Sequence, residues 1–107
     1  MTDKKLVLTT ASSSDEARRI ARALVERRLA ACVNILPQIE SVYRWKGKVE
    51  EAQEWLLIIK TTAAAFERVR DVIRELHSYE LPECVCVSIE DGGPEYLKWI
   101  GESVGYS

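Results

Sequence analysis

The sequence has little of what membrane proteins, nucleic-acid-binding proteins and exported proteins need. Its 107 residues carry a net charge of −2, with acidic and basic side chains interspersed. A basic footprint for nucleic acid is therefore lacking, and so is a polybasic membrane patch. No apolar run approaches the roughly 20 residues of a membrane span. The first ten residues, MTDKKLVLTT, contain a three-residue apolar stretch, which does not predict an export signal. We therefore expect a cytoplasmic protein without nucleic-acid or membrane partners.

Histidine, cysteine and the amide side chains are also scarce. Three cysteines without an export signal indicate reduced thiols rather than a disulfide framework. His77 is the single histidine, so a multi-histidine metal site would have to be shared between copies of the chain. The amides are limited to Asn34, Gln38 and Gln53, while 30% of residues are charged. This composition leans toward a thermostable protein, for which we expect a thermal midpoint above about 65 °C.

Recognisable catalytic and cofactor motifs are absent from the sequence. It has no Ser-His-Asp order, no paired-carboxylate motif and no dinucleotide-binding fingerprint. The Asp-Gly-Gly-Pro run at 91–94 lacks the glycine and lysine pattern of a phosphate-binding loop. We therefore predict a protein that is not an enzyme, has no catalytic residue and uses no organic cofactor.

What the sequence does contain is one very long β-hairpin over residues 31–61, with its turn at Lys46-Gly47. Its first arm, 31–45, would run roughly 50 Å at about 3.3 Å per residue. A compact chain of this length has a diameter of only roughly 35 Å. The hairpin is therefore too long for its own domain, and we expect other copies of the chain to cover it.

The hairpin changes character at Pro37, which cannot donate to a strand ladder and indicates a bulge or an edge position. Before it, residues 31–36 are apolar on both faces, as expected of a central strand covered by helices. Residues 55–60, WLLIIK, likewise predict a buried strand. The part between them, 37–54, is mostly polar, and we expect it to project from the subunit.

The outer end of this projecting part carries exposed apolar side chains. A two-residue turn places Trp45 opposite Lys48 and Tyr43 opposite Glu50. Aromatic side chains are favoured anchors of protein interfaces. We therefore predict that Tyr43, Trp45 and Val49 belong to the interface between copies, and that the functional cleft lies where the arm meets loop 77–82 of a neighbour.

The remaining segments alternate between helix and strand patterns. Ser13 and Glu16 form a capping box before an apolar helical stripe that continues to about residue 28. Thr61 or Thr62 can cap a second helix, and Pro94 suits the first turn of a third. The other predictions are a strand at 5–10, a stripe from Phe66 to Leu76, a loop at 77–83, a fully apolar strand at 84–89 with Cys84 and Cys86 in the core, and a last helix at 95–102.

The order β-α-β-β-α-β-α predicts the fold class. Two strand-helix-strand units with a hairpin between them form an α+β, ferredoxin-like (split β-α-β) subunit. Right-handed crossovers place both main helices on one face of an antiparallel sheet. The opposite face must then be covered by the C-terminal helix or by other subunits. We expect one domain, residues 1–107.

The sequence also resembles the CutA family of divalent-cation-tolerance proteins. The similar segments are ACVN at 31–34, YRWKGK at 43–48, the strand from Glu54 to Thr61, and HSYELPE at 77–83. The resemblance runs from about residue 6 to residue 100. It implies a ferredoxin-like subunit, a homotrimer in which the long hairpins pair with neighbouring sheets, and a role in tolerance to copper and other divalent cations. It also implies an architecture similar to PII-type signalling trimers.

Candidate metal ligands follow from this resemblance and from side-chain chemistry. Imidazole, thiolate and carboxylate groups together can hold copper or zinc, which selects His77, Cys32 and Glu80. Two alternatives stay open, since His77 at a helix end can act as a cap and Cys32 can be a small buried apolar residue. Further residues expected to line an inter-subunit cleft or bind a ligand are Tyr79, Glu54, Lys60 and Trp45.

The chain departs from some family members at two positions. Thr9 stands where some carry a cysteine, and Leu76 stands where some carry the first of two histidines. Our leading hypothesis is a divalent-cation-tolerance homotrimer that binds copper, another divalent metal or a small ligand in inter-subunit clefts. The alternative is a PII-like signal-transduction or interaction scaffold, a trimer that binds a metabolite or a protein partner without a physiological metal.

Overall fold

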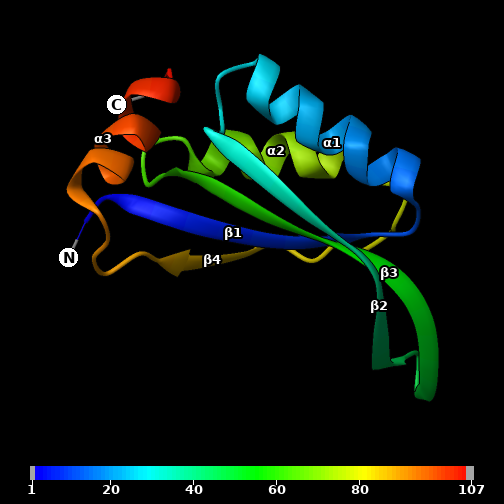
Figure 1. Cartoon of the computed structure of the whole chain (residues 1–107). Helices are drawn as coiled ribbons and strands as arrows, with labels where there is room; N and C mark the ends of the chain where they lie inside the picture. Colours follow the sequence, from blue (N-terminus) through cyan, green and yellow to red (C-terminus); the bar gives the residue numbers. More distant parts are fainter. Residues whose placement is uncertain (1, 106–107) are drawn as a thin grey trace.

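A computed structural model of the chain describes residues 2–105, which form a four-stranded sheet and three helices (Figure 1). The predicted single domain, residues 1–107, includes positions 1, 106 and 107, which lie outside the described residues. The elements are β1 (Lys4–Ala11), α1 (Ser14–Glu26), β2 (Cys32–Trp45), β3 (Lys48–Thr62), α2 (Phe66–Leu76), β4 (Val85–Ser88) and α3 (Pro94–Ser103). This order confirms the α+β class, the long hairpin and the C-terminal helix.

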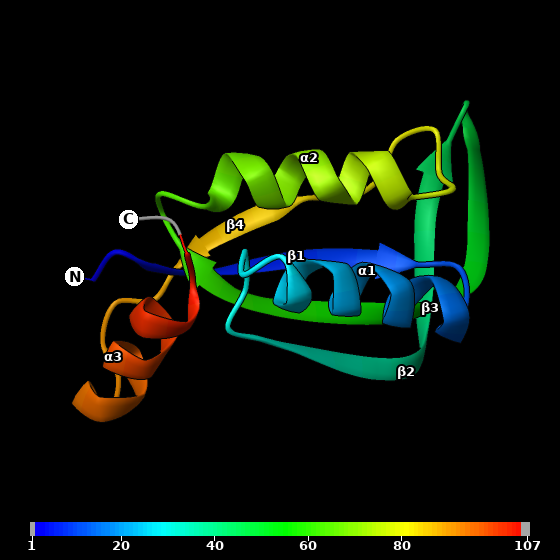
Figure 2. The same cartoon turned by 90° about the horizontal axis from the view of Figure 1, so that it is seen from above.

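The sheet is antiparallel throughout, with strand order β2-β3-β1-β4. Helices α1 and α2 lie side by side over one face, and α3 lies beyond the end of the sheet near the N-terminus (Figure 2). The strand order and the helices on one face support the ferredoxin-like prediction. None of the helices in the described range is long and apolar enough to cross a membrane.

The hydrophobic core lies between the sheet and the two main helices. The apolar stripes predicted for the helices supply its upper layer, and alternate residues of the central strands supply the lower one. Fully or almost fully buried members are Ile20 and Leu24 of α1, Val69 and Ile73 of α2, Val7 of β1, and Leu57 and Ile59 of β3.

The two main helices begin differently. Ser13 Oγ accepts a hydrogen bond from the Glu16 amide at 3.1 Å, which confirms the predicted start of α1. The predicted cap of α2 by Thr61 or Thr62 is wrong for the helix itself, because both residues still belong to β3 and the helix begins at Phe66. Thr62 Oγ1 does accept a hydrogen bond at 3.3 Å from the amide of Ala65, the residue before the helix. Thr61 Oγ1 instead donates to the Leu29 carbonyl at 2.6 Å.

Strand β2 is an edge strand, so the prediction of a central strand at 31–36 is wrong. The helices cover only one sheet face, and Leu36 on the other face is 41% exposed. This strand therefore has apolar residues on both faces although helices cover only one of them. Its other face and its outer edge are uncovered in the single chain. The alternative prediction from Pro37, an edge position or a bulge, is confirmed on both counts, with a register shift between Leu36 and Ile39.

The strand predicted at 84–89 is present in shortened form, but the prediction that Cys86 lies in the core is wrong. Strand β4 covers Val85–Ser88, pairs only with β1 among the described strands, and exposes all four of its residues. Cys84 is half-buried and packs against the core, whereas Cys86 is exposed and is not a core residue. The apolar composition of this strand therefore suits a second open edge.

The outer half of the hairpin bends away from the sheet after the bulge (Figures 1 and 2). The predicted register is confirmed, with Tyr43 opposite Glu50 and Trp45 opposite Lys48. Lys46 and Gly47 both have positive φ angles, 50° and 82°, as a two-residue turn between twisted strands requires. The chain measures 44 × 25 × 22 Å along its principal axes, and much of the elongation comes from this arm.

The turn yields a stability prediction. Gly47→Ala should lower the free energy of unfolding by about 1–2 kcal/mol, because an L side chain at positive φ costs about that much. A Cβ at this position would meet no atom within 4 Å, so the effect is confined to the backbone. Chemical denaturation at one fixed protein concentration measures it. Gly47→Asn is the matched control, since asparagine tolerates this conformation; equal losses for both variants would contradict the explanation.

Candidate functional site

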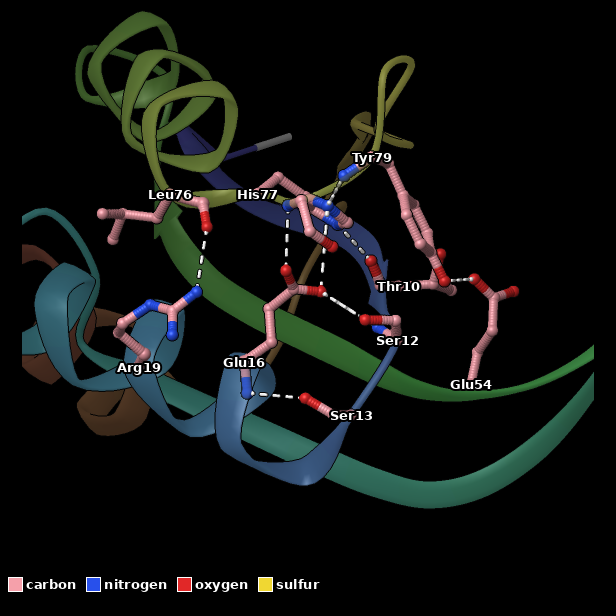
Figure 3. Close-up of polar contacts among 10 residues, drawn as sticks. Thr10, Ser12, Ser13, Glu16, Arg19, Glu54, Leu76, His77 and Tyr79 are labelled. Atoms are coloured by element: carbon pink, nitrogen blue, oxygen red, sulfur yellow. Dashed lines mark hydrogen bonds and ion pairs between the residues drawn. The ribbon is translucent and has the colours of Figure 1, made fainter.

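The loop at 77–83 is fastened to the start of α1 by a buried carboxylate. Glu16 is 4% exposed. Its Oε2 accepts a hydrogen bond from the Ser78 amide at 2.8 Å, and its Oε1 accepts from the Ser12 amide at 3.0 Å and the Ser12 hydroxyl at 3.2 Å (Figure 3). One side chain thus caps a helix and holds a loop 62 residues away in the sequence.

These contacts also set the protonation of the carboxylate. Burial alone would raise the pKa of Glu16, but hydrogen bonds from Ser12 and Ser78 outweigh it and hold this pKa below its ordinary value. Glu16 is therefore ionised in the folded chain at neutral pH. Its charge supports each of the hydrogen bonds that it accepts, because bonds to an ionised acceptor are stronger than neutral ones.

His77 lies behind the loop with its side chain fully buried. Its Nε2–H donates to the Thr10 carbonyl at 2.5 Å, and its Nδ1 accepts from the Tyr79 amide at 3.1 Å. Because one ring nitrogen must donate and the other accept, the geometry assigns the neutral tautomer with the proton on Nε2. Both ring nitrogens are thus engaged, and His77 positions the loop rather than presenting a free lone pair.

Tyr79 connects the loop to the base of the hairpin. Its hydroxyl donates to Glu54 Oε2 at 2.7 Å, and its ring packs against the ring of His77 with centroids 4.5 Å apart (Figure 3). Glu54, on β3, is only 7% exposed. Burial, followed by the hydrogen bond to Glu54, raises the pKa of Tyr79. The hydroxyl therefore remains a donor over the whole physiological pH range.

A groove of about 800 Å³ lies between this loop and the outer half of the hairpin. One copy of the chain forms the walls of this groove, and the predicted cleft between copies stays a prediction. Four carboxylates and three aromatic rings dominate the lining, and no Lys, Arg or His of the described residues contributes to it. The lining residues are Thr10, Glu40, Ser41, Val42, Tyr43, Trp45, Glu54, Ser78, Tyr79, Glu80, Leu81 and Glu83.

The carboxylates give the groove a negative potential. Burial, followed by the charge of Glu54, raises the pKa of Glu83. A carboxylate disfavoured in this way gains from a nearby positive charge. The groove is therefore suited to a cation or to a ligand with a cationic group, and its aromatic rings provide faces for such a group.

The structure brings together some of the predicted site residues and separates others. Trp45, Glu54 and Tyr79, predicted for an inter-subunit cleft, and Glu80, predicted as a metal ligand, all line the groove of one chain. Their roles between subunits stay a prediction. Cys32 and Lys60 face one another on β2 and β3, where Lys60 pairs with Leu6 of β1. Leu6 lies four residues from Thr10, the partner of His77, which corresponds to about 13 Å along the strand. The ammonium of Lys60 instead lies 5.6 Å from the ring centre of Tyr96.

The predicted metal ligands therefore do not meet in one chain. Within residues 2–105, no three His, Cys, Asp or Glu side chains gather closely enough to hold a metal ion. Cys32, His77 and Glu80 would need a second copy of the chain to form a common site. Their role as metal ligands stays a prediction.

Several residues of the site had no such role in the sequence-based prediction. Glu16 was predicted as a helix cap, but its bond to Ser78 is a tertiary contact that no local pattern indicates. Glu40 and Glu83 look like ordinary surface carboxylates in the sequence. The alternation of side chains along the hairpin, which puts Glu40 and Val42 on one side, was the one available signal for the groove wall.

The hairpin tip is apolar, aromatic and basic. Tyr43, Trp45 and Val49, the predicted interface residues, are 44%, 36% and 62% exposed. Three cations surround them, and the ammonium of Lys46 lies 5.6 Å from the ring centre of Trp45. These cations are Arg44, Lys46 and Lys48.

Comparisons with known proteins agree on one family. A family model described as CutA1 divalent ion tolerance protein matches residues 5–103. The divalent-cation tolerance protein CutA of Thermus thermophilus is 50% identical over 102 residues, which cover 95% of this chain and 99% of the relative. A CutA homolog of Xenopus laevis is 50% identical over 95 residues, 89% of this chain. The match spans 63% of the Xenopus protein, less than two thirds of its length.

Solved structures agree with the sequence matches. The divalent cation tolerance protein Cut A1 from Thermus thermophilus superposes with a TM-score of 0.93 at 50% identity, covering 95% of this chain and 99% of that one. The periplasmic divalent cation tolerance protein CutA from Archaeoglobus fulgidus gives a TM-score of 0.91 at 45% identity, covering 94% and 97%. The residues matched by the family model, 5–103, span the hairpin, the loop and the positions that line the groove.

Glu16 generates a pH-dependent prediction. Glu16→Gln should lower the free energy of unfolding by about 1–3 kcal/mol at pH 7, because buried backbone donors lose a charged acceptor. A carboxyl whose folded pKa is lowered stabilises the fold above its ordinary pKa of 4.5, and this stabilisation disappears as the pH falls through the folded pKa. The difference between wild type and variant should therefore shrink in acid. Urea denaturation at pH 7 and pH 3 measures both values.

The matched control for this experiment is Glu26→Gln, which alters an exposed carboxylate of the same helix. Glu26 pairs with Arg22 at 3.4 Å, and exposed pairs of this kind contribute little. The control should leave stability unchanged at both pH values. Equal losses in the two variants, or a Glu16→Gln deficit that stays constant in acid, would contradict the assigned role.

Proposed function

The chain belongs to the CutA1 divalent ion tolerance family, and from this premise we propose that it is a homotrimer that binds copper or another divalent cation, or a small ligand, in clefts between its subunits. The observation that carries the proposal is the acidic, aromatic groove that lies beside an exposed basic hairpin tip. Binding would withdraw free cation, which is a direct physical route to tolerance.

The trimer is supported by charge complementarity and by uncovered apolar surface. A basic tip and an acidic groove on the same chain are two different patches, so their contact between copies is heterologous, and such contacts form rings when the rotation closes. Three exposed apolar side chains on the sheet face opposite the helices would gain from burial. They are Leu36, Val85 and Val87.

The groove supplies oxygen donors for the cation. Carboxylates suit hard divalent ions, and copper(II) binds a given set of oxygen and nitrogen ligands more tightly than the other divalent first-row metals do. Glu54, Glu80 and Glu83 would supply some of these oxygens, but in one described chain they do not gather closely enough to hold an ion. A second copy of the chain would have to complete the ligand set, while His77 and Glu16 hold the loop that carries Glu80 and Glu83. Cys32 lies on the open face of edge strand β2 and is half-buried, where a neighbouring copy can reach it. Bound metal would supply positive charge that draws the carboxylates together, and we propose no catalytic step.

The compartment belongs to the proposal as well. We expect the cytoplasm from the sequence, but relatives differ, since the Archaeoglobus fulgidus protein is described as periplasmic and an Arabidopsis thaliana relative is named chloroplastic. The same groove could also serve the alternative function, a PII-like scaffold that binds a metabolite or a protein partner. The metal experiment below separates the two.

Charge reversal at the tip tests the trimer. Light scattering of the wild type at micromolar concentration should give three times the chain mass of 12.2 kDa. The triple variant Arg44→Glu, Lys46→Glu, Lys48→Glu should give a lighter species, because like charges then face each other at the contact. Adding Glu80→Lys and Glu83→Lys to the same chain should restore the trimer.

A matched control reverses charge elsewhere. Arg18→Glu with Arg22→Glu alters the exposed face of α1, away from tip and groove, and should leave the mass at three chains. A wild type that is monomeric at micromolar concentration would defeat the trimer. A trimer that survives the triple variant would show that the tip does not contact the groove.

Calorimetric titration of copper(II) and of zinc tests the metal. Wild type should show saturable binding near one ion per subunit, and Glu54→Gln should weaken it about tenfold or more, by analogy with losses at metal-site partners. Glu26→Gln, which lies outside the groove, should bind as the wild type does.

His77→Gln separates positioning from ligation. An amide can replace the hydrogen bonds of the imidazole but not its metal bond, so retained binding assigns His77 a positioning role and lost binding with an intact fold assigns it as a ligand. The metal content of the purified protein provides an independent reading. Absence of saturable binding for both ions would remove the metal function and leave the scaffold.

A further inference from the structure

Cys84 and Cys86 lie on the same side of the sheet, at its β4 edge. Cys86 pairs with Val7 of β1, and Val7 is buried under the helices, so Cys86 faces the helix side. Side chains two residues apart in extended backbone share a face, and Cys84 indeed packs against the core. One thiol is therefore half-buried and the other exposed. Neither lines the groove.

The spacing of the two thiols favours a bridging atom over a direct bond. Two residues along a strand separate the Cα atoms by about 6.5–7 Å, at or beyond the limit of about 6.8 Å for a disulfide. A metal–thiolate bond of about 2.3 Å places two sulfurs on opposite sides of one ion about 4.5 Å apart. Rotation about the side-chain bonds brings two such thiols to that separation without backbone movement.

Both acidic and basic side chains lie near the pair of thiols. Burial raises the pKa of Cys84, and the charges of Cys86 and Glu83 raise it further, while Arg70 and Arg74 of α2 oppose this. Arg70 Nε is also buried without a hydrogen-bond partner in the described part of the chain. A cation shared by both sulfurs would remove their repulsion, and the two guanidinium groups would offset the remaining negative charge.

We propose that Cys84 and Cys86 form a two-coordinate site for a thiophilic monovalent metal ion, with copper(I) as its natural ligand. Soft thiolates select copper(I), and copper(I) accepts two sulfurs in a linear arrangement. Zinc, by contrast, needs four ligands, and no further His, Cys, Asp or Glu in the described range completes such a set. Binding exchanges one copper(I) ion for the two thiol protons and involves no oxidation.

The test is anaerobic titration of copper(I) against a chromogenic copper(I) chelator, in a Cys32→Ser background that removes the third thiol. This parent should bind one equivalent per chain. Cys86→Ser and Cys84→Ser should each lower the affinity at least tenfold, because one sulfur cannot replace two. Circular dichroism checks the fold, and the exposed Cys86 provides a variant that does not disturb the core.

A matched control keeps the number of thiols and changes only their spacing. Cys86→Ser combined with Ser88→Cys leaves two thiols on the same face of the strand, but about 13 Å apart, so binding should not recover. Recovery in this variant, or equal affinity of the parent and the single-thiol variants, would overturn the paired site. X-ray absorption of the loaded parent should show two sulfur neighbours, and any other number would overturn it as well.

Discussion

The buried carboxylate of Glu16 is the contact on which the candidate site depends. One wall of the groove is the hairpin, whose two strands are hydrogen-bonded to each other. The other wall is the loop at 77–83, which has no regular backbone hydrogen bonding. Glu16 fixes that loop because one carboxylate oxygen accepts a hydrogen bond from the Ser78 amide, while the other oxygen accepts from the Ser12 amide at the start of α1. His77 and Tyr79 then extend the connection to β1 and to Glu54 of the hairpin. Both walls are therefore held by one continuous polar network under the loop.

The hairpin shows how one element can serve two environments. Up to the bulge after Leu36 its strands belong to the sheet, and beyond the bulge they leave the sheet and form the groove wall. A bulge inserts a residue and bends a strand, and here the positive φ angle of Gln38 marks the change of direction. The same bend carries the basic, aromatic tip away from the chain's own core. The tip is therefore exposed because the strand bends there, and not only because of which residues it contains.

Most of the fold could be predicted from the sequence, because its signals are local. The capping box at Ser13, the turn at Lys46-Gly47 and the helical stripes each lie within a few residues, and all are confirmed. One local prediction, the threonine cap of α2, is wrong. The other errors concern what covers each element. Residues 31–36 were predicted as a covered central strand, and Cys86 as a core residue, because apolar runs look the same at an open edge and in a core. The groove could be predicted only in part, since the bond between Glu16 and Ser78 joins residues that no spacing rule connects.

The two proposed metal sites, one with oxygen ligands and one with sulfur ligands, are adjacent in the sequence. Glu83 lines the acidic groove, whereas Cys84 packs on the helix side beside Arg70 and Arg74. Carboxylates prefer hard divalent ions and thiolates prefer soft monovalent ones, so the two proposed sites would not compete for the same form of copper. Because the thiols face the helices and the carboxylates face the hairpin, the two proposed sites lie on different sides of the sheet edge. The loop fastened by Glu16 leads directly into both, which makes its fixed position a shared requirement of the oxygen site and the sulfur site.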